Sequence, residues 1–153
     1  MDAIDRRILR ELSRDGRISN QKLSERVGLS SSACLRRVQA LERAGILAGY
    51  RAVLNPSLMG VGFIAYVAIG LNDHSAEALQ AVEQACARTE EVVECHNVTG
   101  AVCYLLRIEA ADIEAYKRIH TQVLAKLPMV AQMTTHVVLG SPKSGREPFV
   151  PRP

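Results

Sequence analysis

Two short amphipathic segments, separated by only three residues, place the tightest constraint on the fold of this chain. The first segment is expected to be a helix over about 20–27, with Ser19 as its N-cap. The second is expected to begin after Ser30 and to run to about Arg43. A tight turn containing Gly28 joins them, and two short helices joined in this way are typical of a helix-turn-helix.

The flanking residues complete a small domain of three helices. A helix is expected over 2–14, where apolar residues recur on one face and charged residues occupy the rest. After the third helix, residues 46–54 are expected to form a short hairpin, a wing, broken at Gly49. We therefore predict a winged helix-turn-helix domain over 1–54, followed by a linker over 55–60.

The second half of the chain alternates strand and helix patterns in the order β-α-β-β-α-β. This order is that of the split, ferredoxin-like unit, so the predicted fold class is α+β with a ferredoxin-like βαββαβ domain over 61–140. The first strand is apolar on both faces, which predicts cover on both sides. The tail over 141–153 is rich in Gly, Pro and charge, and is expected to be an extended arm. Strands are expected at 61–71, 92–98, 102–109 and 131–139, and helices at 75–88 and 112–127.

Positive charge is concentrated in the predicted helix-turn-helix. Residues 1–55 hold 11 Lys and Arg against 6 Asp and Glu, a net charge of +5. Residues 56–153 hold 8 against 10, a net charge of −2. This asymmetry predicts that only the first part meets a polyanion. No apolar run approaches the roughly 20 residues of a membrane span and no secretory signal is present, so a cytoplasmic location and no membrane partner are expected.

The expected third helix carries the residue types that read DNA. Short polar side chains near the start of a recognition helix let its backbone enter the major groove, and Arg and Gln reach base edges and phosphates. A solvated face on a small helical bundle is the simpler alternative. The candidate base contacts are Ser31, Ser32, Arg36, Arg37 and Gln39, and the candidate phosphate contacts are Ser19, Asn20, Arg43 and Arg51.

The sequence offers little support for catalysis or a metal site. It contains no nucleophile and base pair, no phosphate-binding loop and no Cys-x-x-Cys motif, so no enzyme activity, cofactor or metal is expected. Cys95 and His96 are neighbours on a predicted strand and therefore point to opposite faces. The four cysteines, Cys34, Cys86, Cys95 and Cys103, are expected to be reduced, buried residues.

Many short motifs carry a resemblance to one family of regulators. They are Asp5 to Leu9, Asp15 to Ser19, Leu23 with Val27 to Ser30, Cys34 to Val38, Leu41-Glu42, Gly45-Ile46, Gly49-Tyr50, Leu54 to Pro56, Glu94 to His96, Val98 to Gly100, Tyr104 to Leu106, Asp112 with Tyr116, Leu127-Pro128 and Val137-Val138. Over roughly 2–139 the chain resembles the leucine-responsive/asparagine-regulator (Lrp/AsnC) transcription factors of the feast-or-famine type. The resemblance implies a sequence-specific regulator that binds double-stranded DNA and associates with the nucleoid.

The resemblance also implies an assembly and an effector. Such proteins pair through their C-terminal domains, whose sheets face each other, and their dimers often assemble into octamers. An amino acid or a related small molecule usually binds between dimers. The lining candidates that the resemblance implies here are Asn97, Val98, Thr99, Gly100, Ala101, Cys103, His136 and Val137. An architectural protein that wraps DNA with little sequence preference is the alternative function.

The chain departs from the family pattern in the loop expected to bind the effector. Ala101-Val102-Cys103 stands where the family usually has an acidic residue, an aromatic residue and Asp, and Met129 stands where Gly is common. Loop carboxylates would suit the ammonium group of an amino acid. Three alternatives stay open: a different or less polar effector, binding through backbone groups alone, or no effector.

Overall fold

The computed structural model describes residues 1–142. These residues divide into two compact units, Met1–Val53 and Leu54–Pro142. The division falls within one residue of the predicted end of the DNA-binding domain, and the predicted linker belongs to the second unit. The predicted tail lies outside the described residues from residue 143 onward.

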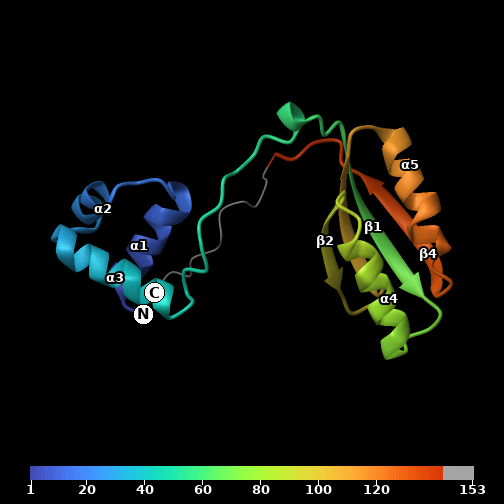
Figure 1. The fold of residues 1–153 in the computed structure, drawn as a ribbon, viewed down its shortest axis with the longest axis horizontal. Coiled ribbons are helices and arrows are strands. Elements are labelled where there is room, and N and C mark those ends of the chain that lie inside the picture. The colour runs from blue at the N-terminus through green and yellow to red at the C-terminus, as the bar shows by residue number, and fades with distance from the viewer. Residues whose placement is uncertain (143–153) are drawn as a thin grey trace. The chain divides into compact units, whose positions relative to one another are not determined.

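The first unit is a bundle of three helices: α1 (Ala3–Arg14), α2 (Asn20–Val27) and α3 (Ser31–Arg43) (Figure 1). Each helix begins at a side-chain cap, because Asp2, Ser19 and Ser30 each accept a hydrogen bond from the backbone N–H three residues further on. The helices agree with the predicted ranges to within one residue. Their apolar faces share one core, made of Ile8, Leu12, Leu23, Val27, Cys34 and Leu41.

The segment after α3 differs from the prediction. Residues 46–54 contain no strand, so the expected wing hairpin is not formed in the described chain. The N–H groups of Ile46 and Leu47 instead donate to the carbonyl of Leu41, at 3.0 and 3.2 Å. The chain thus turns back onto the end of α3 after Gly45, and these bonds take the place of a strand ladder.

The second unit is a four-stranded antiparallel sheet with two helices, as predicted. The strand order is β2-β3-β1-β4, and each neighbouring pair is antiparallel. The expected long helix over 112–127 is shorter than predicted, because after α5 the chain tightens into a 3₁₀ turn before Pro128. The elements are β1 (Phe63–Leu71), α4 (Ala76–Ala87), β2 (Val92–Asn97), β3 (Tyr104–Ala110), α5 (Ile113–Gln122) and β4 (Val130–Val137), with 3₁₀ turns η1 (Ser57–Met59) and η2 (Leu124–Lys126).

The two helices cover only one face of the sheet. Alternate residues of β1 and β3, such as Val67 and Leu106, are fully buried against Val82 of α4 and Ile119 of α5. The residues between them point to the opposite face, where Tyr66 remains 37% exposed. The prediction that the first strand is covered on both faces is therefore not met within one chain. We call this second surface the open face of the sheet.

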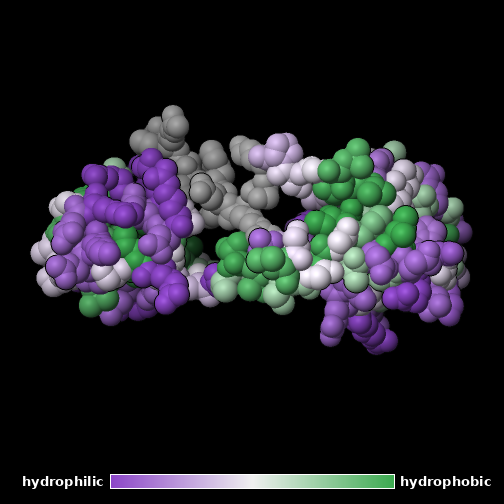
Figure 2. Space-filling model, turned by 90° about the horizontal axis from the view of Figure 1, so that it is seen from above, coloured by the Kyte–Doolittle hydropathy of each residue, from purple (hydrophilic) through white to green (hydrophobic). Residues whose placement is uncertain are grey.

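Hydrophobic side chains are also exposed along the linker. Val53, Leu54, Leu58 and Met59 are each at least 60% exposed, and they contribute to the hydrophobic patch around η1 in Figure 2. A patch of this kind marks a surface that another molecule covers more often than it marks a solvated loop.

Among residues 1–142, no helix is both long enough and apolar enough to cross a bilayer.

Candidate DNA-binding surface and effector loop

The joint between α2 and α3 fixes the orientation of the predicted recognition helix. Gly28 ends α2 in the left-handed conformation with φ of 75°, which a residue without a Cβ adopts at no steric cost. The side-chain amide of Asn20 donates to the backbone carbonyl of Ser31 at 2.8 Å, and the Ser24 and Ser31 hydroxyls lie 3.2 Å apart. These contacts tie the start of α2 to the start of α3.

Four of the predicted DNA contacts form one exposed strip along α3. Ser32, Arg36, Gln39 and Arg43 are all exposed. A helix turns by about 100° per residue, so these four positions point roughly 140–200° away from the fully buried Cys34. Within the described residues the guanidinium groups of Arg36 and Arg43 have no ion-pair or hydrogen-bond partner. We call these four residues the α3 strip. The Ser32 hydroxyl lies 3.3 Å from the Ser30 hydroxyl, and the other three side chains have no hydrogen-bond partner among residues 1–142.

Arg37 does not belong to the α3 strip. Its guanidinium Nη1 lies 2.7 Å from Asp2 Oδ2 and 2.8 Å from Asp5 Oδ1, at the start of α1. The backbone N–H of Asp5 and then Arg37 hold the pKa of Asp2 below its ordinary value of 3.8. The two carboxylates in turn raise the pKa of Arg37. The charge of Arg37 is therefore already paired within the first unit, and its assignment to base readout stays a prediction.

The other predicted DNA contacts form hydrogen bonds within the first unit or lie outside α3. The Ser19 hydroxyl caps α2 by accepting from the N–H of Lys22 at 3.3 Å. Asn20 and Ser31 belong to the joint between α2 and α3, and the Asn20 Oδ1 atom is buried without a partner among the described residues. Arg51 is exposed in the segment where the wing was expected.

The predicted effector loop is a closed turn between β2 and β3. The N–H of Val98 donates to the carbonyl of Cys103 at 2.9 Å, and the N–H of Cys103 donates to the carbonyl of Ile69 at 2.7 Å. Gly100 sits at the tip with φ of 125°. The structure thus holds Asn97, Val98, Thr99, Gly100, Ala101 and Cys103 together in one short loop anchored to β1.

His136 and Val137 do not lie with this loop in one chain. They are on β4, whereas the loop follows β2, and these two strands form opposite edges of the sheet. His136 pairs with Tyr66 on the open face, and Val137 pairs with Ala65, so the two side chains point to opposite faces. The eight predicted effector residues therefore do not form one pocket within a single chain.

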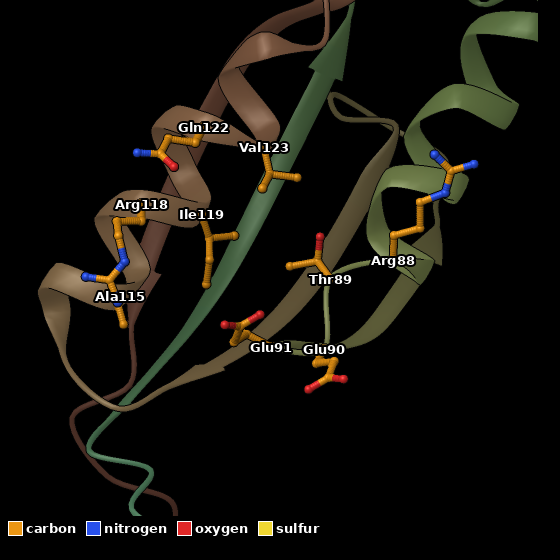
Figure 3. Close-up of a pocket in the computed structure, with 9 residues that line it drawn as sticks. All are labelled: Arg88, Thr89, Glu90, Glu91, Ala115, Arg118, Ile119, Gln122 and Val123. Carbon is orange, nitrogen blue, oxygen red and sulfur yellow. The ribbon is translucent and has the colours of Figure 1, made fainter.

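The chain has a separate groove of about 430 Å³ between the end of α4 and α5. Figure 3 shows Ile119 and Val123 of α5 on the side that faces Thr89, in the segment that leads into β2, and Arg118 and Gln122 further round the helix. None of the predicted effector residues lines it, and no feature of the sequence predicted it. The full lining is Arg88, Thr89, Glu90, Glu91, Ala115, Arg118, Ile119, Gln122 and Val123.

The cysteines divide into two groups. Cys34 and Cys86 are buried as predicted, but Cys95 on the edge strand is exposed and Cys103 is partly exposed. The Cys103 Sγ atom lies 3.7 Å from His74 Nδ1, a contact between residues 29 positions apart that sequence spacing did not signal. Among residues 1–142, no three His, Cys, Asp or Glu side chains are grouped so that they could hold a metal ion.

A helix-turn-helix with a free cationic strip, followed by a ferredoxin-like sheet, defines a regulator with a DNA-binding domain and a separate ligand-binding domain. Residues 1–48 match a winged helix-turn-helix DNA-binding domain, and residues 64–148 match the Lrp/AsnC ligand-binding domain. The chain belongs to the Lrp/AsnC family of DNA-binding transcription regulators. The resemblance and the fold class predicted from the sequence are confirmed.

Relatives and solved structures agree over nearly the whole length. The leucine-responsive regulatory protein of Escherichia coli is 43% identical over 139 residues, which cover 91% of this chain and 85% of that protein. A transcriptional regulator from Neisseria meningitidis, solved in complex with L-methionine, has a TM-score of 0.89 at 33% identity and covers 94% and 93% of the two chains. The feast or famine regulatory protein of M. tuberculosis, also complexed with L-methionine, has a TM-score of 0.83 at 33% identity, over 98% and 99%.

The Arg37 ion pairs predict a pH-dependent contribution to stability. Because the pKa of Asp2 is lowered in the folded chain, its pairing stabilises the fold above the ordinary value of 3.8 and is lost as the pH falls through the lower, folded value. Arg37→Ala should therefore lower Tm by a few degrees at pH 7, and the difference from wild type should shrink below pH 3.8. Thermal melts of Arg36→Ala provide the matched control, since the Arg36 side chain has no ion-pair or hydrogen-bond partner in residues 1–142. An equal loss in both variants would show that Arg37 has no special role in holding α3.

Proposed function

We propose that the α3 strip enters the major groove of duplex DNA and selects the sites that this regulator controls. The proposal rests on one observation: Ser32, Arg36, Gln39 and Arg43 lie on one exposed face of α3, and the guanidinium groups of Arg36 and Arg43 are unpaired within the described part of the chain. Gln39 and Arg36 have the donors and acceptors to read base edges, and Arg43, one turn further on, suits a phosphate. Short Ser32 lets the start of the helix approach closely. Such a protein acts by binding and not by catalysis, and it acts at the nucleoid in the cytoplasm.

Arg36→Ala should weaken binding to a DNA fragment selected by the wild-type protein from a random library. We expect a loss of about tenfold or more, because a good base contact discriminates by about 1–3 kcal/mol. Arg43→Ala should weaken selected and random duplexes alike, and should reduce the slope of log K against log salt by about 1. Fluorescence anisotropy at several salt concentrations measures both effects.

Arg118→Ala in the second unit is the matched control, since it removes an exposed Arg away from the α3 strip. Equal binding of Arg36→Ala and wild type would contradict the proposed groove contact. Failure of the library to enrich any sequence would favour an architectural protein instead, because such a protein binds through phosphates with little sequence preference.

We infer that the open face of the sheet pairs with the open face of a second copy. Tyr66 and Leu105 supply apolar surface at its centre, and Arg107 is already paired with Glu109 in a half-buried ion pair at 2.5 Å. Neutralised charge and apolar surface together suit burial better than contact with water. Dimers built in this way are the units from which an octamer of four dimers would assemble.

Tyr66→Asp should convert the dimer to monomer at micromolar concentration, because it removes apolar surface from the centre of the interface and places there a carboxylate that burial would strip of water. Sedimentation velocity measures the change. Ile113→Asp is the control, because Ile113 is 62% exposed at the start of α5, on the covered side of the sheet, where an acidic side chain also suits the helix N-terminus. A wild-type chain that sediments as a monomer, or a Tyr66→Asp chain that stays dimeric, would reject the open face as the interface.

We further propose that an amino acid or a related small molecule binds at the loop over 97–103, between dimers. The L-methionine complexes of two structural neighbours support this class of effector. His136 and Val137 can line the same site only from another subunit, because in one chain they lie at the opposite edge of the sheet. Without carboxylates in the loop, the ammonium group of the effector would be held by backbone carbonyls.

A thermal-shift screen of the full chain against the common amino acids should therefore give at least one hit. An effector present at 100 times its Kd stabilises the native state by about 2.7 kcal/mol. Ala101→Asp restores one family carboxylate and should strengthen binding of the same hit. A flat screen of wild type together with a hit for Ala101→Asp would show that this chain has lost the amino-acid response.

A further inference from the structure

A thiol and an imidazole meet beside the proposed effector loop. Cys103 Sγ lies 3.7 Å from His74 Nδ1, within the distance of a hydrogen bond to sulfur. The two residues come from different loops, since His74 follows β1 and Cys103 precedes β3. The backbone of Cys103 is fixed by its hydrogen bond to Ile69 and by that from Val98.

The His74 loop is also held in place. The Asp73 carboxylate accepts a hydrogen bond from the Ser75 N–H at 2.8 Å, and the Ser75 hydroxyl caps α4 through the N–H of Ala78 at 3.2 Å. The hydrogen bond from Ser75, with the charge of His74 as a smaller contribution, lowers the pKa of Asp73. The turn that carries His74 is thus fixed by two hydrogen bonds of its neighbours.

The other three thiols of the chain have surroundings that suppress reactivity. Burial raises the pKa of Cys34 and Cys95, and raises that of Cys86 to about 12. Because the thiolate is the nucleophilic form of cysteine, these groups react slowly at neutral pH. Cys103 differs from Cys34 and Cys86 because it is only partly buried, and it differs from all three because an imidazole lies against its sulfur.

We propose that Cys103 is a reactive thiol, that His74 accepts its proton, and that small disulfides of the cystine class modify it by exchange. The Cys103 thiolate attacks one sulfur of the disulfide, a new S–S bond forms, and the old S–S bond breaks. The other half leaves as a thiolate and takes the proton from His74. The step consumes one disulfide and releases one thiol, so no further oxidant is needed.

The modified residue lies in the loop where the effector is proposed to bind. A thiol in this loop can form a covalent bond with a ligand, which a carboxylate or a hydroxyl there could not do under the same mild conditions. An amino-acid disulfide would leave one amino-acid half attached to the loop. The effect of this adduct on DNA binding rests on the proposed function, whereas the reactivity of Cys103 does not.

The reactivity is tested with dithiodipyridine, an aromatic disulfide whose released thione is followed by absorbance across a wide pH range. Wild type should show one fast thiol at pH 6, and His74→Gln should slow it by about tenfold or more, because the variant lacks the group that accepts the proton of Cys103. The gap should close near pH 9, where an unassisted thiol ionises. A merely structural role for His74 would not shift the pH profile in this way.

Matched variants assign the thiol. Cys103→Ser should abolish the fast phase and Cys95→Ser should keep it, with circular dichroism showing that both are folded. After incubation with L-cystine, intact mass spectrometry should show one cysteinyl group on wild type and none on Cys103→Ser. Equal rates and pH profiles for wild type and His74→Gln, or a fast phase that persists in Cys103→Ser, would overturn the proposal.

The same samples separate this inference from the proposed function. Reduced wild type should bind the selected DNA fragment, and the cystine-treated protein should bind it with altered affinity, whereas treated Cys103→Ser should bind as before. Loss of DNA binding in every reduced sample would contradict the proposed function and leave the thiol chemistry intact. A cysteinyl adduct without any change in DNA affinity would show that Cys103 is reactive but does not regulate.

Discussion

The surface that the first unit offers to DNA depends on how α3 is rotated about its own axis. Burial of Cys34 and Leu41 in the three-helix core sets this rotation, because both side chains are almost fully enclosed. Positions roughly half a turn away then face outward, which gives the α3 strip its alignment. Arg37 lies only about 60° from Cys34 around the helix, so its guanidinium meets the first turn of α1. The same rotation of α3 that exposes Arg36 therefore turns Arg37 away from the α3 strip.

The sequence was sufficient for the parts of the fold that local chemistry decides. Apolar spacing and the caps at Ser19 and Ser30 predicted the three helices of the first unit to within a residue, and the alternation of strand and helix patterns predicted the order of the elements along the second unit. Residues 1–48 match a winged helix-turn-helix domain as predicted, but the hairpin expected over 46–54 is not formed, because the partner of Ile46 is the carbonyl of Leu41 at the end of α3. The role of Arg37 was missed for a related reason, since its partners are 32 and 35 residues away.

The second unit shows what a single chain leaves incomplete. A sheet with helices on one face exposes the alternate residues of every strand on the other. In this chain those residues include Tyr66, Leu105 and the ion pair of Arg107 with Glu109. Because the two charges of the pair neutralise each other, a second protein surface can cover the open face at a small cost in desolvation. The apolar composition of the first strand predicted that both of its faces are buried. The sequence does not show whether the second face is buried by the same chain or by another subunit. The separation of His136 from the loop over 97–103 has the same cause, because a site shared between subunits is not visible in one of them.

The loop between β2 and β3 shows how one substitution can change the chemistry of a site while its backbone stays fixed. Its closure depends on main-chain bonds from Val98 and to Ile69, which any residue at position 103 can make. The side chain there is consequently free to vary, and Cys in place of the usual Asp keeps a small polar group while removing a permanent charge. An exposed Asp binds cations reversibly through its charge, whereas a thiol beside an imidazole can bind a small disulfide covalently. A regulator whose loop is rigid and whose contact group is nucleophilic would respond to the redox form of a small molecule as well as to its concentration.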